Sequence, residues 1–173
     1  MIELETERLH LRQWRLDDFE WYAGLCSDEE VMRFLGGRPL ARLDAWRQFT
    51  SVVGHWQLRG YGLWAVQEKL SGNLVGRVGI IDHEGWPGFE IGWTLVRSAW
   101  GRGYATEAAR QAMLYAFDAL NRDRIISLIH PDNRASRRVA ERLGESVHGT
   151  TELMGAEVLL YGMSRSDWIA RRA

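Results

Sequence analysis

A loop with two glycines is the segment of this chain best suited to bind an anion. Gly101 and Gly103 lie on either side of Arg102, and a helical pattern begins directly after them. Glycine lets the backbone approach a ligand closely, and the first amides of a helix lack acceptors within the helix. These amides and the positive end of the helix dipole predict a diphosphate site, to which the Arg102 side chain adds charge. The residues of this predicted site are Gly101, Arg102, Gly103, Tyr104, Ala105 and Thr106.

The same loop is also compatible with an ordinary helix start that binds nothing. Two other phosphate-binding motifs do not fit it. A P-loop requires a lysine followed by serine or threonine after its last glycine, and no such pair follows Gly103. A dinucleotide-binding loop requires a third glycine or alanine where this chain has Thr106. The alternatives are therefore a diphosphate loop of another kind or a plain helix start.

The segments before this loop predict a strand, two helices and a meander. Leu9 and Leu11 alternate with polar residues, which predicts a strand from Glu5 to Trp14. The run Ser27-Asp28-Glu29-Glu30 resembles a capping box, so we expect one helix to begin there and a second to run from about Ala41 to Leu58. Turn residues separate three strand-like runs, which should pair as an antiparallel meander. These runs are Tyr61 to Glu68, Leu74 to Ile81 and Phe89 to Val96.

The segments after the loop alternate between helix and strand. Alanines recur at helical spacing after Gly103 and form a narrow face that can pack closely against a sheet. A strand from Arg124 to His130 precedes a helix from about Asn133 to Leu143, and Gly144 is the expected helix stop. A final strand is expected from Val158 to Ser164. Because no linker, repeat or low-complexity segment interrupts the pattern, we expect residues 1–173 to form a single domain.

Composition narrows the classes of partner. The formal net charge is −1, from 22 basic and 23 acidic residues, so no global field favours nucleic acid or an anionic membrane. Cys26 is the only cysteine, and the five histidines lack the paired spacing of a zinc site, so no metal is expected. The amino terminus lacks the apolar block of a secretory signal, and no apolar run is long enough to span a bilayer. We therefore expect a cytoplasmic protein.

The glycine loop and two further blocks resemble the GNAT superfamily of N-acetyltransferases, and within it the ribosomal-protein-alanine N-acetyltransferase branch. The glycine and alanine of the family's loop match Gly103 and Ala105, whereas Trp100 stands where most members have a glutamine or arginine. The resemblance spans almost the whole chain. Its segments are Glu5 to Arg12, Trp100 to Ala108, His130 to Ser136 and Val139 to Gly144.

The resemblance implies an α/β (α+β) fold with acetyl-CoA as cosubstrate. The GNAT fold has a central mixed, mostly antiparallel twisted sheet of six to seven strands, flanked by helices. The sheet splays between strands four and five, here Phe89 to Val96 and Arg124 to His130, and the coenzyme occupies that splay. Backbone groups near Leu95 and Val96 would then pair with the pantetheine amide, and an amide there could hold the thioester oxygen. Asn133 would hydrogen-bond the pantetheine arm.

Glu90 is the candidate general base. An amine attacks a thioester only when neutral, so a carboxylate near the acyl group can take the proton of its ammonium form. Strand alternation places Glu90 on one face with Gly92 and Thr94, within a few residues of the expected oxyanion site. The glutamate would act directly or through water. The alternative is a carboxylate that faces solvent or pairs with an arginine.

Ser136 is the candidate partner of the departing thiolate. Many superfamily members use a tyrosine on the coenzyme-binding helix as the acid, but the matching position here is Ala140. Ser136 lies three residues after Asn133, hence on nearly the same helix face. It would protonate the sulfur or, because a hydroxyl is a poor acid, only hydrogen-bond it.

The sequence thus predicts an enzyme that moves an acetyl group from acetyl-CoA to a primary amine, by direct attack on the thioester. The acceptor is either a protein amino terminus or a small molecule, and a homodimer is compatible with the family. A catalytically silent acyl-CoA sensor or interaction domain is the alternative, if Glu90 and Ser136 are only scaffold. A dinucleotide-dependent oxidoreductase is a third, disfavoured by the glycine pattern.

Overall fold

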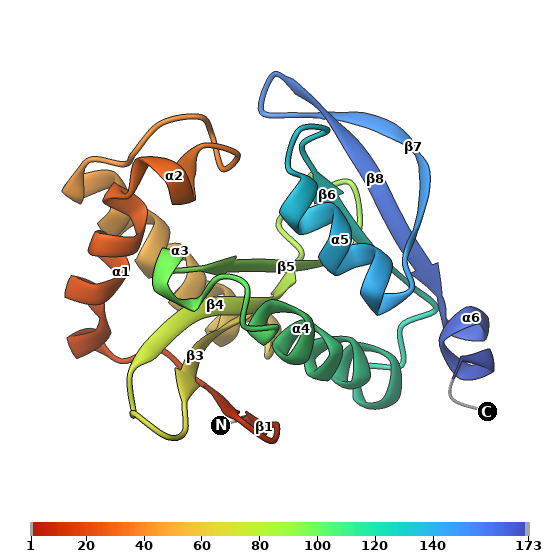
Figure 1. The fold of residues 1–173 in the computed structure, drawn as a ribbon, viewed down its shortest axis with the longest axis horizontal. Coiled ribbons are helices and arrows are strands. Elements are labelled where there is room, and N and C mark those ends of the chain that lie inside the picture. The colour runs from red at the N-terminus through yellow and green to blue at the C-terminus, as the bar shows by residue number, and fades with distance from the viewer. Residues whose placement is uncertain (1, 172–173) are drawn as a thin grey trace.

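One mixed sheet organises the molecule. The computed structural model describes residues 2–171 and places eight strands in the order β1-β2-β3-β4-β5-β6-β8-β7 (Figure 1). All neighbouring strands are antiparallel except β5 and β6. The strands are β1 Leu4–Glu5, β2 Leu9–Arg12, β3 Leu63–Glu68, β4 Leu74–Ile81, β5 Glu90–Leu95, β6 Arg124–Ile129, β7 Ser146–Leu153 and β8 Ala156–Ser164.

The predicted amino-terminal strand is divided in two. A turn separates β1 from β2, and the two pair with each other, so a continuous strand from Glu5 to Trp14 is wrong. The Thr6 hydroxyl causes the break, because it accepts the Leu9 amide at 2.9 Å. This local side-chain bond competes with extended structure. The turn brings Thr6 and the neighbouring Arg8 against the helix that follows the glycine loop.

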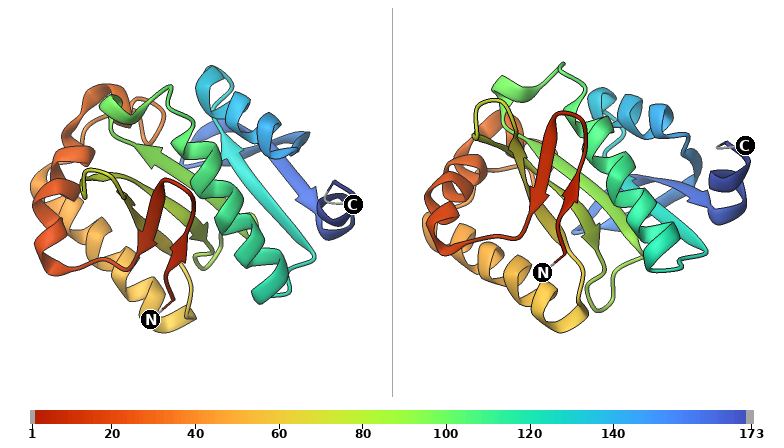
Figure 2. Two further views of the ribbon diagram at one scale, coloured as in Figure 1. Left: turned by 60° about the horizontal axis from the view of Figure 1, so that its bottom comes forward. Right: turned by 90° about the horizontal axis from the view of Figure 1, so that it is seen from below.

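Three helices follow β2, and α1 and α3 cover one face of the sheet (Figure 2). They are α1 Phe19–Ser27, α2 Glu29–Met32 and α3 Arg42–Arg59. Ser27 is the last residue of α1 and not a helix cap, which corrects the predicted capping box. Asp28 caps α2 instead, because its carboxylate accepts the amides of Glu30 and Val31. The predicted second helix agrees with α3 to within one residue at each end.

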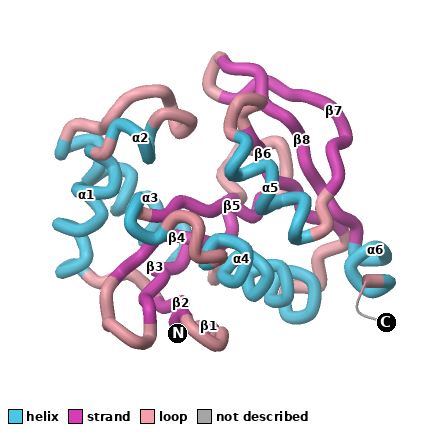
Figure 3. The backbone as a smooth tube through the Cα atoms, viewed as in Figure 1, coloured by secondary structure: helices cyan, strands magenta, loops and turns pink. Residues whose placement is uncertain are grey.

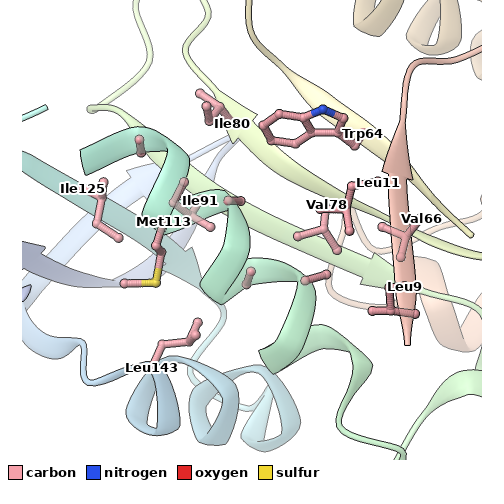
Figure 4. Packing of buried hydrophobic residues seen from close by; sticks show 14 of the residues in the cluster. Leu9, Leu11, Trp64, Val66, Val78, Ile80, Ile91, Met113, Ile125 and Leu143 are labelled. Carbon is pink, nitrogen blue, oxygen red and sulfur yellow. The ribbon is translucent and has the colours of Figure 1, made fainter. Parts of the chain in front are cut away.

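The meander and the alanine-rich helix are confirmed. Strands β3, β4 and β5 pair in sequence order, and α4 Tyr104–Leu114 crosses the other face of the sheet. Three of its four alanines have no exposed surface, so the helix lies close to the strands. Apolar residues of β2 to β6, with Met113 from α4, form the main core shown in Figure 4. The buried alanines are Ala108, Ala109 and Ala112, followed by Ala116 in a π-helical turn.

The carboxyl-terminal part adds more strand than the sequence predicts. Helix α5 Arg134–Leu143 stops at Gly144, which has φ +93° as expected for a left-handed cap. Strand β7 then pairs with β8 at the sheet edge, and α6 Arg165–Ala170 follows (Figure 3). The mixed, mostly antiparallel sheet is confirmed, whereas the expected six to seven strands become eight because β1 and β7 are added. No helix among the described residues could cross a membrane.

Candidate active site

The separation of β5 from β6 defines the site. These parallel strands pair at one position only, Glu90 opposite Ile126. There the Ile126 amide donates to the Phe89 carbonyl at 2.9 Å. A regular parallel ladder would next bring the Leu128 amide to the Ile91 carbonyl. That bond is replaced by side-chain bonds, so the strands part here as predicted, and we call this point the fork.

At the fork, two side chains form hydrogen bonds with the backbone groups that the parallel ladder leaves unpaired. The Leu128 amide donates to Glu90 Oε1 at 3.2 Å. The Ser127 hydroxyl donates to the Ile91 carbonyl at 2.8 Å. Buried backbone groups need partners, so these two side chains stabilise the divergence of the strands. The Glu90 side chain is thus hydrogen-bonded to a backbone amide inside the fork and does not face solvent.

The environment of Glu90 suits a proton acceptor. The side chain is buried, and Trp86 Nε1 donates to its Oε2 at 2.7 Å. Burial raises the pKa of Glu90 to about 7, although the bonds from Trp86 and Leu128 act in the opposite direction. A base works best when its pKa lies near the operating pH. No arginine pairs with this carboxylate among the described residues, so the surface ion-pair alternative does not describe it.

Backbone groups of β5 face the open side of the fork. The Val96 amide donates to the Val75 carbonyl of β4 at 3.0 Å. Antiparallel pairing alternates, so the peptide groups of Leu95 and Trp93 point away from β4 and toward the fork. Both backbone groups of Val96 are engaged, because its carbonyl also accepts the Ala99 amide. The Leu95 carbonyl accepts Trp100 Nε1 at 2.9 Å. The groups that face the fork are therefore the Leu95 amide and both peptide groups of Trp93, and Val96 does not take its predicted place.

A pocket of about 410 Å³ extends from the fork to the glycine loop and α4. Its volume is within the range of small-molecule sites. It brings together most of the residues predicted for coenzyme binding, with Ser136, whereas Val96 and Arg102 do not line it. The predicted residues in its wall are Leu95, Gly101, Gly103, Tyr104, Ala105, Thr106, Asn133 and Ser136. Residues around the end of α2 also line the pocket, namely Glu30, Val31, Arg33, Phe34 and Leu35.

The first turn of α4 leaves donors free for an anion. Gly103 is the cap, with φ +81°, and no side chain caps the helix. The first helical bond runs from the Glu107 amide to the Gly103 carbonyl, 3.1 Å, so the three amides before Glu107 have no helical acceptor. The buried Thr106 hydroxyl also lacks a partner among the described residues. These donors fit a diphosphate, which is the binding mode predicted from the loop.

Arg102 is placed differently from the expectation. Its guanidinium forms an ion pair with Glu68 at 2.7 Å and lies over the Tyr104 ring. The Arg102 carbonyl accepts a bond from Arg8. The side chain therefore anchors the loop to β3 and does not line the pocket. Positive charge in the pocket wall comes instead from Arg33, Arg138 and Arg142.

The start of α5 supplies two polar groups to the pocket. Asn133 caps the helix, because its Oδ1 accepts the Ser136 amide at 3.1 Å, so its side-chain NH₂ is left to donate to a ligand. Trp93 Nε1 donates to Ser136 Oγ at 3.3 Å, which leaves the hydroxyl proton free. Tyr161 of β8 packs beside Ala140, but its hydroxyl is bound to Arg137 and Glu141. It therefore does not replace the missing tyrosine.

Strand β5 carries both Glu90 and residues that line the pocket, but Glu90 lies deeper in the fork than the pocket does. Thr94 lines the pocket, whereas Glu90 lies four residues earlier, at the closed end of the fork. Gly92 lies between them on the same face. A Cβ there would come within 2.9 Å of Ile81 and 4.0 Å of Glu90 Oε1. Glycine at this position avoids a clash with Ile81 and places no side chain between Thr94 and the carboxylate.

Comparison with known proteins identifies the family. The model of the GNAT acetyltransferase domain matches residues 8–145. Protein YkkB of Bacillus subtilis (strain 168) is 34% identical, with 92% of this chain and 94% of YkkB covered. N-acetyltransferase p20 of Bacillus licheniformis is 30% identical, with coverage of 86% and 85%. The solved structure of an acetyltransferase from Agrobacterium tumefaciens str. C58 has a TM-score of 0.86 at 32% identity, covering 94% of both chains.

The chain therefore belongs to the GNAT acetyltransferase family, and it is an acetyl-CoA-dependent N-acetyltransferase. The donors at α4 and the pocket are compatible with the diphosphate and pantetheine parts of acetyl-CoA. No group of three or more potential metal ligands occurs within residues 2–171.

The unpaired Thr106 hydroxyl gives a direct test of the diphosphate position. We expect Thr106→Val to weaken acetyl-CoA binding about tenfold, the loss of one hydrogen bond to a charged group. The melting temperature should stay level or rise, because a methyl replaces a buried hydroxyl without a partner. Thr106→Ser keeps the hydroxyl and is the control. Calorimetric titration measures both affinities, and equal affinity in the two variants would contradict the assignment.

Proposed function

We propose that this enzyme transfers the acetyl group of acetyl-CoA directly to a primary amine at the fork, with Glu90 as the base. The observation that carries the proposal is the buried Glu90 carboxylate, whose pKa burial raises to about 7, on the strand that lines the pocket. We also propose that residues 1–173 act as one domain in the cytoplasm.

Acetyl-CoA would supply an acyl group activated as a thioester. The free amides of α4 and the Thr106 hydroxyl would bind the diphosphate. Asn133, the Leu95 amide and the peptide groups of Trp93 would bind the pantetheine arm along β5. One of those two amides would stabilise the negative charge that develops on the acyl oxygen.

Glu90 and Ser136 would handle the protons. Ionised Glu90 would take the proton of the incoming ammonium through water, because the carboxylate lies at the closed end of the fork and does not line the pocket. After attack, the second proton of the nitrogen would pass to the departing thiolate, whose sulfur accepts a hydrogen bond from the free Ser136 hydroxyl. Direct attack needs no covalent enzyme intermediate, and burial raises the pKa of the Cys26 thiol, which makes it a poor nucleophile.

An acceptor screen tests the proposal. Purified enzyme with acetyl-CoA and a panel of peptides with free amino termini, polyamines and aminoglycosides should release coenzyme A with at least one acceptor. Thermal stabilisation by acetyl-CoA, measured in parallel, reports binding without turnover. Stabilisation with no coenzyme release from any acceptor would instead indicate an acyl-CoA-binding domain. The screen also separates a protein amino terminus from a small-molecule acceptor, and gel filtration tests the proposed homodimer.

Trp86 should tune the base. Its indole donates to Glu90 and lowers the pKa of that carboxyl against the effect of burial. We expect Trp86→Phe to raise this pKa further, by about 0.5 to 1 unit. Because Glu90 must be ionised, the rate rises with pH through its pKa, and the rise should move to higher pH in the variant. The pH dependence of kcat measures this, with Trp46→Phe on α3 as control; an unmoved profile would contradict it.

A further inference from the structure

A second buried carboxyl group lies at the fork. Glu145 follows the helix stop Gly144 and precedes β7, and its side chain is 5% exposed. Its Oε1 is 3.1 Å from Ser127 Oγ, and its Oε2 has no hydrogen-bond partner among the described residues. An unpaired buried carboxylate is costly, so this arrangement needs a physical reason.

The hydrogen bonds at Ser127 indicate whether Glu145 is protonated or ionised. The hydroxyl has one proton, and its oxygen lies 2.8 Å from the Ile91 carbonyl, which can only accept. The Ser127 proton therefore belongs to that bond, and the contact with Glu145 is a hydrogen bond only if the carboxyl donates. Burial raises the pKa of Glu145 to about 8, and the nearby charge of Glu90 raises it as well. Both observations describe a protonated Glu145 at neutral pH.

The surroundings of Glu145 do not offset a negative charge. The groups on neighbouring elements are Arg110 of α4, Arg124 of β6, Arg142 of α5, His148 of β7 and Arg171 after α6, besides Glu90 of β5. Arg110 donates to the Arg142 carbonyl, and Arg171 packs on Gly144. Within residues 2–171, Glu90 is the one charge that acts on the Glu145 pKa.

We propose that Glu145 is a positioning residue for the base: in its protonated form it donates to Ser127, which holds the Ile91 carbonyl and leaves the Leu128 amide for Glu90. The inference rests on the proposed role of Glu90. When Glu145 loses its proton to solvent, it no longer donates to Ser127 and adds a second negative charge beside Glu90. The fork then loses the arrangement that aims the base.

The pH profile distinguishes this role from simple packing. Glutamine is nearly isosteric with a protonated glutamate, donates to Ser127 and cannot ionise. Glu145→Gln should keep at least half of kcat at pH 7, at saturating acetyl-CoA and amine. The wild-type kcat should decline above about pH 8, as Glu145 ionises, and this decline should move up by a unit or more in the variant. Glu157→Gln, an exposed glutamate of β8, is the control.

A double variant tests the route through Ser127. Ser127→Ala should lower kcat at all pH values, because the Ile91 carbonyl loses its partner. Adding Glu145→Gln to Ser127→Ala should move the alkaline decline by much less than Glu145→Gln moves it in the wild type, because residues in one chain of bonds are not additive. An alkaline decline in Glu145→Gln equal to that of the wild type would overturn the proposal. An equal shift of the decline with and without Ser127 would do the same.

Melting curves separate failure of this inference from failure of the proposed function. The folded protein keeps a proton on Glu145 up to about pH 8, whereas the unfolded chain releases it near pH 4.5. Stability from this group therefore falls as pH rises between those values. From pH 5 to pH 8, the wild type should lose about 5 °C or more relative to Glu145→Gln. Parallel melting curves would refute a protonated Glu145, even if no amine is acetylated; diverging curves without turnover would instead count against the base role of Glu90.

Discussion

Glu90→Gln should lower kcat by about 100-fold or more at pH 7 while acetyl-CoA affinity changes less than about twofold. General-base catalysis contributes at least this factor, and Glu90 does not line the coenzyme pocket. Glutamine still accepts one of the two hydrogen bonds, from Leu128 or Trp86, so the fork should persist. Steady-state kinetics and calorimetric titration measure the two quantities.

The effect of Glu90→Gln should depend on pH in a definite direction. Burial raises the pKa of Glu90 to about 7, so the ionised base is present above that pH and is lost as pH falls through it. The wild-type rate should therefore rise through about pH 7, and the residual rate of Glu90→Gln should lack this rise. Glu84→Gln changes an exposed glutamate in the connection between β4 and β5, and its pH profile should be that of the wild type. A retained rise in Glu90→Gln would remove Glu90 from the mechanism.

Ala105→Asp should raise the Kd for acetyl-CoA by about 100-fold, with Ala105→Asn raising it about tenfold or less. Ala105 is in the first turn of α4 and lines the pocket. The aspartate would compete with the diphosphate for the free amides and would repel its negative charge. Asparagine has the same size but no charge, so it only takes up space and competes more weakly for the amides. A charge-to-phosphate repulsion in a partly buried site is worth a few kcal/mol, and 1.4 kcal/mol is tenfold.

The fold should survive the same substitution. A negative side chain in the first turn of a helix is favourable by about 0.3–1 kcal/mol, so the melting temperature without ligand should not fall. Saturating acetyl-CoA should restore kcat in both variants, because Glu90 and the fork are untouched. Equal Kd values for Ala105→Asp and Ala105→Asn would show that the diphosphate does not lie at this turn.

Periodic and local signals made part of this molecule predictable. The strand-like runs of β3 to β5 with turn residues between them, the alanine spacing in α4 and the stop at Gly144 depend on neighbours along the chain, and the structure confirms them. Strand β7 was missed because its side chains are mostly exposed, so no apolar alternation marks it. The division of the first strand depends on one hydroxyl bond at Thr6, which alternation does not register.

The site shows a similar limit. The glycine loop is a contiguous signal, so its place beside the pocket was predictable. The ion pair of Arg102 with Glu68 joins residues 34 positions apart, and nothing local indicates it. The bond of Trp86 to Glu90 depends on how the β4–β5 connection folds back, and nothing in the neighbouring sequence indicates it. Glu145 has no motif, and only burial beside Ser127 distinguishes it.

A crystal structure of the enzyme with coenzyme A tests the central claim most directly. We expect diphosphate oxygens within hydrogen-bond distance of the α4 first-turn amides and Thr106 Oγ1. The pantetheine should lie in the fork against Leu95 and Trp93, with its sulfur near Ser136. A diphosphate bound away from α4, or β5 and β6 closed together with the pantetheine outside them, would contradict the assigned site.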